Sequence, residues 1–196
     1  MTRIISGRAK GARLSVPKGA RTRPTTDRVR EALFSSIVTW FNSADADAAH
    51  HLAGLAVADL YSGSGAVALE AASRGAARVF AVEADTPTAH LIGQNADRLG
   101  LDVRVRATKA LAWAAGAEAS ALDLVFIDPP YDVPSSDIER LVATLVERDA
   151  LVEDALVVVE RSARSAPISW PEGWANSWDR HYGETVLHFA TPQGDV

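Results

Sequence analysis

From residue 55 onward, short apolar segments alternate with amphipathic segments of helical length. Strands are predicted at 56–60, 78–83, 102–106, 122–127 and 155–160, with helices between them at 65–73, 86–99, 108–115 and 135–148. Apolar strands that alternate with helices are typical of a parallel sheet covered on both faces, because each parallel crossover needs a helix. Two further strands, 177–182 and 185–190, predict an antiparallel pair at one edge. The pattern therefore predicts an α/β fold.

The segment AVADLYSGSGAVALEAASRG, residues 56–75, predicts a strand, a tight glycine loop and a helix. Gly63 and Gly65 permit a positive φ and a close approach of the backbone to a ligand. Ala68 takes the place of the third glycine in the nucleotide-binding fingerprint. The next strand ends at Glu83, where an acid can accept hydrogen bonds from a ribose diol. A nucleoside-type ligand is therefore indicated.

Asp59, at the end of the first strand of this unit, indicates which kind of nucleotide ligand the loop can bind. A dinucleotide would bring its pyrophosphate to the start of the following helix, beside this carboxylate. S-adenosylmethionine carries a ribose, a sulfonium and an α-amino group, but no phosphate. The acid pair Asp59 and Glu83 therefore favours S-adenosylmethionine.

The segment LDLVFIDPPY, residues 122–131, fixes an acid and an aromatic side chain after a buried strand. Pro129 and Pro130 lack an N–H and restrict φ, so the turn is stiff. The Asp128 carboxylate and the Pro129 carbonyl can both accept from one amino group, which orients its nitrogen toward a methyl sulfonium. Tyr131 offers a face for a flipped-out base, an interaction worth roughly 1–3 kcal/mol. Since the glycine loop and this turn both end parallel strands, we expect them at one edge of the sheet.

Charge is distributed unevenly along the chain. Residues 1–30 carry nine Lys and Arg side chains and one acid, although the whole chain has 20 bases, 25 acids and a net charge of −5. A basic segment on an acidic body favours a polyanionic partner, of which nucleic acid is the most common.

Composition argues against several other classes. The chain has no cysteine, which excludes disulfides and thiolate metal sites. Its five histidines form no cluster with acids at ligand spacing, so we expect no metal. No long apolar run and no signal-peptide pattern is present, which predicts a soluble, cytoplasmic protein without membrane contact.

The N-terminal part has its own pattern. Residues 2–16 predict a short β-hairpin with its turn at 7–11. After a loop, Thr25 or Thr26 is placed to cap a helix that runs to Phe41. We therefore divide the chain into a basic, RNA-binding hairpin extension, residues 1–22, and an S-adenosylmethionine-dependent methyltransferase domain, residues 23–196.

The motifs DLYSGSG, AVE and DPPY, in this order, resemble those of class I S-adenosylmethionine-dependent amino-methyltransferases. RIISGRAKGARL (3–14) and RPTTDRVREALF (23–34) resemble the RsmD family, and the likeness continues through LEAASRGA, VVVE and HYGET. The resemblance implies a Rossmann-like, mostly parallel sheet of seven strands in the order 3-2-1-4-5-7-6, with strand 7 antiparallel and helices on both sides. It implies methyl transfer to N2 of a guanine in the helix 31 loop of 16S rRNA, within a partly assembled small ribosomal subunit. A monomer is usual for such a chain.

The expected site residues form three groups. Those expected to hold the acceptor base are Asp128, Pro129, Pro130 and Tyr131. Those expected to bind the cofactor are Asp59, Tyr61, Ser62, Gly63, Gly65, Glu83, Ala84, Thr108, Ala110 and Asp128. Those expected to bind RNA are Arg3, Arg8, Lys10, Arg13, Arg21, Arg23, Arg28 and Arg30.

One position departs from the family pattern, and two other functions stay open. Lys109 stands where the family usually offers an acid or amide to the adenine amino group, and an ammonium cannot accept a hydrogen bond. Thr108 or the Ala110 amide is the alternative contact. DPPY is shared with adenine-N6 methyltransferases of DNA or RNA, although no separate target-recognition domain is visible. A non-catalytic RNA-binding assembly factor is the second alternative, against which the intact Gly63, Gly65 and DPPY argue.

Overall fold

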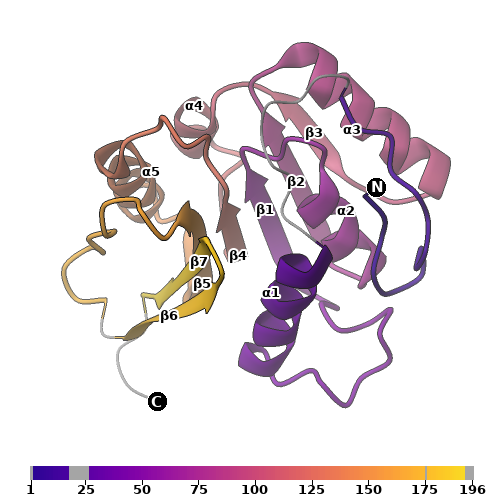
Figure 1. The fold of residues 1–196 in the computed structure, drawn as a ribbon, viewed down its shortest axis with the longest axis horizontal. Coiled ribbons are helices and arrows are strands. Elements are labelled where there is room, and N and C mark those ends of the chain that lie inside the picture. The colour runs from indigo at the N-terminus through magenta and orange to yellow at the C-terminus, as the bar shows by residue number, and fades with distance from the viewer. Residues whose placement is uncertain (1, 18–26, 175, 193–196) are drawn as a thin grey trace.

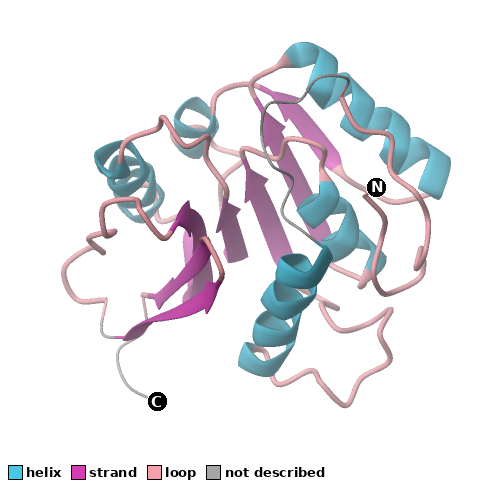
Figure 2. Ribbon diagram, in the orientation of Figure 1, coloured by secondary structure: helices cyan, strands magenta, loops and turns pink. Residues whose placement is uncertain are grey.

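The computed structural model describes residues 2–17, 27–174 and 176–192, in which a central sheet has helices on both faces (Figure 1; Figure 2). The strands are β1 (Ala56–Leu60), β2 (Arg78–Glu83), β3 (Arg104–Ala107), β4 (Leu122–Ile127), β5 (Leu151–Ser162), β6 (Asn176–Tyr182) and β7 (Thr185–Thr191). The helices are α1 (Asp27–Trp40), α2 (Ala66–Ser73), α3 (Thr86–Leu99), α4 (Ala110–Ala114) and α5 (Ser135–Glu147).

The seven strands lie in the order β3-β2-β1-β4-β5-β7-β6. Neighbouring strands from β3 to β5 are parallel, whereas β7 is antiparallel to both β5 and β6. This arrangement confirms the predicted fold class, strand order and antiparallel strand 7. The largest differences from the predicted bounds are at β3, which begins at Arg104, at α4, which spans five residues, and at β5, which begins at Leu151. The start of β5 was missed because it carries the exposed acids Glu153 and Asp154.

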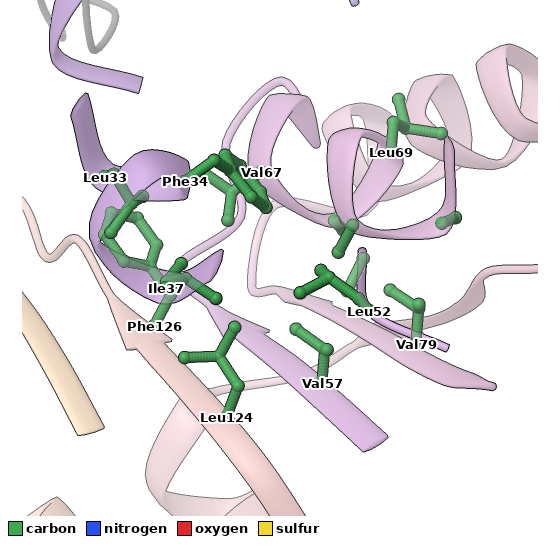
Figure 3. Packing of buried hydrophobic residues seen from close by; sticks show 14 of the residues in the cluster. Leu33, Phe34, Ile37, Leu52, Val57, Val67, Leu69, Val79, Leu124 and Phe126 are labelled. Atoms are coloured by element: carbon green, nitrogen blue, oxygen red, sulfur yellow. The ribbon is translucent and has the colours of Figure 1, made fainter. Parts of the chain in front are cut away.

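Two hydrophobic clusters fill the spaces between the sheet and its helices. On one face, Phe34 and Ile37 of α1 pack with Phe126 of β4 and with residues of α2 (Figure 3). On the other face, Trp113 of α4 and Leu141 of α5 pack against the sheet. Each such side chain, fully buried, contributes roughly 1.5–3 kcal/mol. Because helices cover both faces, the strand ends are the part of the sheet that remains open to ligands.

The N-terminal hairpin is present in a reduced form. Arg3 and Arg13 form a single antiparallel bridge, because most of the intervening segment is turn. Ile4 and Leu14 are 1% and 7% exposed and belong to the same hydrophobic cluster as α1 and α2. Residues 2–17 therefore share a core with the α/β body.

Glu70 of α2 fastens the hairpin to the body. Its carboxylate is fully buried and accepts from the N–H groups of Ile5 at 2.7 Å and Ser6 at 2.9 Å. It also accepts from the Arg74 Nε at 2.9 Å. The division into two domains stays a prediction, since its boundary at residues 22 and 23 and the proposed caps Thr25 and Thr26 lie outside the described residues. The contacts of Glu70 nevertheless show that removing the hairpin would leave a buried charge without its backbone donors.

Replacing Glu70 with alanine is predicted to lower the free energy of unfolding by about 3–5 kcal/mol, because it leaves the buried Arg74 guanidinium and two amides unpaired. Chemical denaturation measures this. The matched control is Glu31→Ala, on the exposed side of α1, with an expected change within about 0.5 kcal/mol. Equal losses in the two variants would contradict the role given to Glu70.

Candidate active site at the carboxyl edge of the sheet

Strands β2, β1 and β4 end side by side, which brings the two sequence motifs together. In the parallel registers, Leu60 of β1 lies opposite Val82 of β2 and Ile127 of β4. The Asp128 N–H continues the ladder to the Leu60 carbonyl at 3.3 Å. The glycine loop after β1, Glu83 at the end of β2 and the turn after β4 therefore share one edge, as the sequence predicted.

The loop after β1 has an unusual backbone. Tyr61, Gly63 and Gly65 all have positive φ, of 65°, 51° and 75°. A Cβ on Gly65 would lie 2.7 Å from a side-chain carbon of Ile92 in α3, so Gly65 is needed for packing as well as for its φ. A Cβ on Gly63 would meet no atom closer than the Tyr61 carbonyl at 4.0 Å. The open space beside Gly63 leaves its backbone accessible to a ligand, whereas Gly65 serves the fold.

Glu83 holds this loop in place from the neighbouring strand. One of its carboxylate oxygens accepts from the Gly63 N–H at 2.8 Å, and the other accepts from the Asp85 N–H at 2.8 Å. A carboxylate has about four lone-pair positions, so two of them stay available for a ribose diol. The Ser62 N–H adds a second link to β2, through the Val82 carbonyl at 3.0 Å.

Asp59 lies beneath the glycine loop. It is 2% exposed, and its carboxylate accepts from the Ala68 N–H in the first turn of α2 at 3.0 Å. Burial raises the pKa of Asp59 to about 7, and the carboxylates of Asp128 and Glu83 add to the rise, while the Ala68 hydrogen bond opposes it. The sequence suggested a direct ligand contact. In the structure Asp59 fixes the loop to the helix, and its contact with the cofactor stays a prediction.

The residues of the turn after β4 differ in how far they are exposed to solvent. Pro129 is buried, whereas Pro130 is exposed. The Tyr131 side chain is 66% exposed, which is unusual for a large aromatic residue and leaves its ring face open for stacking. The Val133 N–H donates to the Pro130 carbonyl at 3.0 Å and closes the turn.

The third part of the edge lies between β2 and β3. Glu83 pairs in register with Ala107, so Ala84 and Thr108 follow on adjacent strands. Ala84 is exposed, Thr108 is half-buried and Ala110 is buried at 4% exposure. Lys109 is exposed and stands before α4 without a side-chain capping bond. Thr108 thus lies near Glu83, and its predicted contact with the adenine stays a prediction.

The predicted RNA-binding residues fall into three sets. Arg21 and Arg23 lie outside the described residues. Those whose side chains are exposed are Arg3, Arg8, Lys10, Arg13 and Arg28. They come from the hairpin and the start of α1, on the same face of the sheet as α2 and α3 (Figure 1).

Arg30 was predicted to bind RNA, and the structure corrects this expectation. The residue is 0% exposed, and its Nη2 donates to the Arg3 carbonyl and, at 3.0 Å, to the Asp27 carboxylate. It therefore ties α1 to the hairpin and cannot reach a phosphate. The signal was available in the sequence, since Leu33 and Phe34 follow Arg30 at the spacing of one buried helix face.

Arg161, near the end of β5, was not singled out from the sequence. It is 6% exposed, and its Nη2 donates to the Val133 carbonyl at 2.8 Å, in the turn that carries Tyr131. Its sequence signal is a base two residues after the buried run Val157–Val159, in a strand next to β4.

The residues present fit a cationic nucleoside. Burial is the main cause of the raised pKa of Asp59, and the carboxylates of Asp128 and Glu83 at this edge raise it further. A sulfonium and an α-amino group would relieve the repulsion, whereas a pyrophosphate would increase it. Within the described part of the chain, no group of three or more His, Asp or Glu side chains is arranged to hold a metal ion. No described helix is long and apolar enough to cross a membrane.

Comparisons with known proteins agree with this geometry. Residues 2–191 match the family model described as Conserved hypothetical protein 95. The chain is 32% identical to Ribosomal RNA small subunit methyltransferase D of Escherichia coli K12, over 98% of this chain and 92% of that protein.

Solved structures show the same fold. A putative methyltransferase, yhhF, from Escherichia coli superposes with a TM-score of 0.81 at 27% identity, covering 99% of both chains. The Thermus thermophilus 16S rRNA N2 G1207 methyltransferase RsmC, in complex with AdoMet and guanosine, shares the fold with a TM-score of 0.63 at 18% identity, over 91% of this chain and 45% of that one. With a family model that spans nearly the whole chain and a relative at 32% identity, this chain belongs to the RsmD family of S-adenosylmethionine-dependent ribosomal RNA methyltransferases.

Proposed function

We propose that this protein transfers the methyl group of S-adenosylmethionine to the exocyclic N2 of a guanine in 16S rRNA. The observation that carries the proposal is the shared edge, where the glycine loop and the turn Asp128–Tyr131 lie on adjacent strands. The RNA and its ribosomal subunit are suggested by the relative named small subunit methyltransferase D. The helix 31 loop, in a partly assembled subunit, is the target that the family resemblance implies.

When bound, S-adenosylmethionine supplies an electrophilic methyl group. On this chain, Glu83 would hold the ribose, and the backbone beside Gly63 would contact the rest of the cofactor through its open space. Ala84, Thr108 and the Ala110 amide are placed for the adenine. Tyr61 and Ser62, in the same loop, complete the proposed set of cofactor residues.

The acceptor base would lie against the turn after β4. The Asp128 carboxylate and the Pro129 carbonyl accept hydrogen bonds from the amino group, which orients the nitrogen and stabilises the positive charge that develops on it. Pro130 keeps the turn stiff. Tyr131, with its exposed ring, stacks on the flipped-out base.

The exposed basic residues would hold the RNA on the hairpin side of the site. Arg3, Arg8, Lys10, Arg13 and Arg28 are placed for phosphate contacts, which give affinity without reading sequence. The hairpin is fixed to α2, and α2 begins at the glycine loop. Bound RNA would therefore lie at a defined position relative to the cofactor.

The reaction is tested with small subunits that lack this modification, using S-adenosylmethionine with a labelled methyl group followed by nucleoside analysis. Wild-type protein is expected to produce N2-methylguanosine, and Asp128→Ala to lower the rate by at least a hundredfold because the amine loses an acceptor. N6-methyladenosine as the product would instead support an adenine methyltransferase. No product on subunits, naked 16S RNA or DNA would favour a non-catalytic assembly factor.

Cofactor affinity is predicted to depend on pH through Asp59. A cationic ligand favours the ionised carboxylate, so binding lowers the raised pKa of Asp59 and releases a proton. Affinity should therefore rise between pH 5.5 and 7 and level off above pH 7, as calorimetry would measure. Asp59→Asn should flatten this dependence, whereas Asp97→Asn, on the exposed side of α3, should keep it. A wild-type affinity that is constant from pH 5.5 to 7 would contradict the role of Asp59.

RNA binding is tested by removing charge, since deleting the hairpin would also remove core residues. Replacing Arg8, Lys10 and Arg13 together with glutamine should reduce the slope of log affinity against log salt by about two, for three lost phosphate contacts. Filter binding at several salt concentrations measures the slope. Arg148→Gln, exposed just after α5 on the other face of the sheet, is the control and should leave the slope unchanged. An unchanged slope in the triple variant would remove the hairpin from RNA recognition.

A further inference from the structure

Arg161 is a buried positive charge near the sheet edge that carries the carboxylates of Asp59, Glu83 and Asp128. It is the penultimate residue of β5 and pairs in register with Val186 of β7. At 6% exposure, its guanidinium is covered by protein and lies outside the set of groups to which the proposed chemistry gives a role. A buried arginine needs a compensating partner, so its surroundings indicate what it does.

One contact of Arg161 is to the acceptor-binding turn itself. Its Nη2 donates to the Val133 carbonyl at 2.8 Å, and the Val133 N–H donates back along the chain to the Pro130 carbonyl at 3.0 Å. The turn is therefore fastened to β1 as well as to β5, because the Asp128 N–H donates to the Leu60 carbonyl of β1.

A second interaction is with the catalytic carboxylate. Burial lowers the pKa of the Arg161 guanidinium, and the negative charge of Asp128 opposes this most strongly. Asp128 therefore has a positive neighbour on the β5 side, whereas Asp59 is affected by the carboxylates of Asp128 and Glu83. The two carboxylates of the site thus stand in different electrostatic surroundings.

One N–H group of the Arg161 guanidinium makes no hydrogen bond to the described residues. Its Nε is buried, and among the described residues no acceptor lies within hydrogen-bond distance of it. A buried donor without a partner is uncommon in native proteins, so this N–H calls for a structural or functional explanation.

We propose that Arg161 is a positioning residue for the acceptor base. It fixes the turn from Asp128 to Val133 on strand β5, so that the Asp128 carboxylate and the Pro129 carbonyl converge on one amino group. Arg161 itself gives and takes no proton in methyl transfer. This inference rests on the proposed function, because it assigns a role within that same site.

The kinetic test uses Arg161→Met, which removes charge and donors at similar length, and Arg161→Lys, which keeps the charge. With undermethylated small subunits, Arg161→Met should lower kcat by ten- to a hundredfold while changing the affinity for S-adenosylmethionine less than threefold. Arg161→Lys should recover part of the loss. The control is Arg164→Met, three residues further on, whose side chain is 85% exposed and pairs with Glu184; its kcat should stay within twofold.

Two kinetic results would overturn the proposal. One is a kcat within twofold of wild type for Arg161→Met. The other is a cofactor affinity that falls as far as kcat does, with no recovery in Arg161→Lys, because this would indicate general damage to the fold.

A thermal double-mutant cycle tests the Arg161–Asp128 interaction without any substrate. Arg161→Met should lower the unfolding midpoint less in an Asp128→Asn background than in the wild type, because the negative charge that Arg161 stabilises is then absent. Equal shifts in the two backgrounds would contradict the charge pairing. Because this cycle needs no methyl transfer, it separates a failure of this inference from a failure of the proposed function.

Discussion

The parallel pairing of β1 with β2 and β4 is the constraint on which the rest of the site depends. It brings Asp59, Glu83 and Asp128 to one edge of the sheet, close enough for their carboxylates to repel one another. Each carboxylate is restrained by a different neighbour: Asp59 by the Ala68 amide, Glu83 by the Gly63 amide and Asp128 by the charge of Arg161. The three carboxylates are therefore held in place by the fold, and a sulfonium cofactor would add a positive charge beside them.

Helix α2 links this edge to the basic hairpin. Its first turn holds Asp59 through the Ala68 amide, and its last turn holds the hairpin through Glu70 and Ser73. Seven of its eight residues are buried, so the helix is packed on nearly every side. In a helix so enclosed, both ends keep a fixed separation, which sets the distance between the basic hairpin and the glycine loop.

The sequence alone predicted much of the fold and the location of the site. Apolar strands, helical spacing and glycines at loop positions are local signals, so β1, β2 and β4 were found with their observed bounds. Burial of charged residues is set by tertiary packing and was not predicted, as three of the buried charges illustrate. Arg30 faces the core, Asp59 lies under the loop, and Arg161 supports the acceptor turn. Each of these residues carries a charge that composition alone assigns to the surface.

We propose that the cofactor and the guanine meet between the glycine loop and the Asp128–Tyr131 turn. A crystal structure of the protein with S-adenosylhomocysteine and an RNA hairpin carrying the target guanine would test this most directly. We expect the guanine amino group to lie within hydrogen-bond distance of both the Asp128 carboxylate and the Pro129 carbonyl. Its nitrogen should be in line with the cofactor sulfur, and the base should stack on the Tyr131 ring. A guanine bound elsewhere, or an amino group held by other residues, would contradict it.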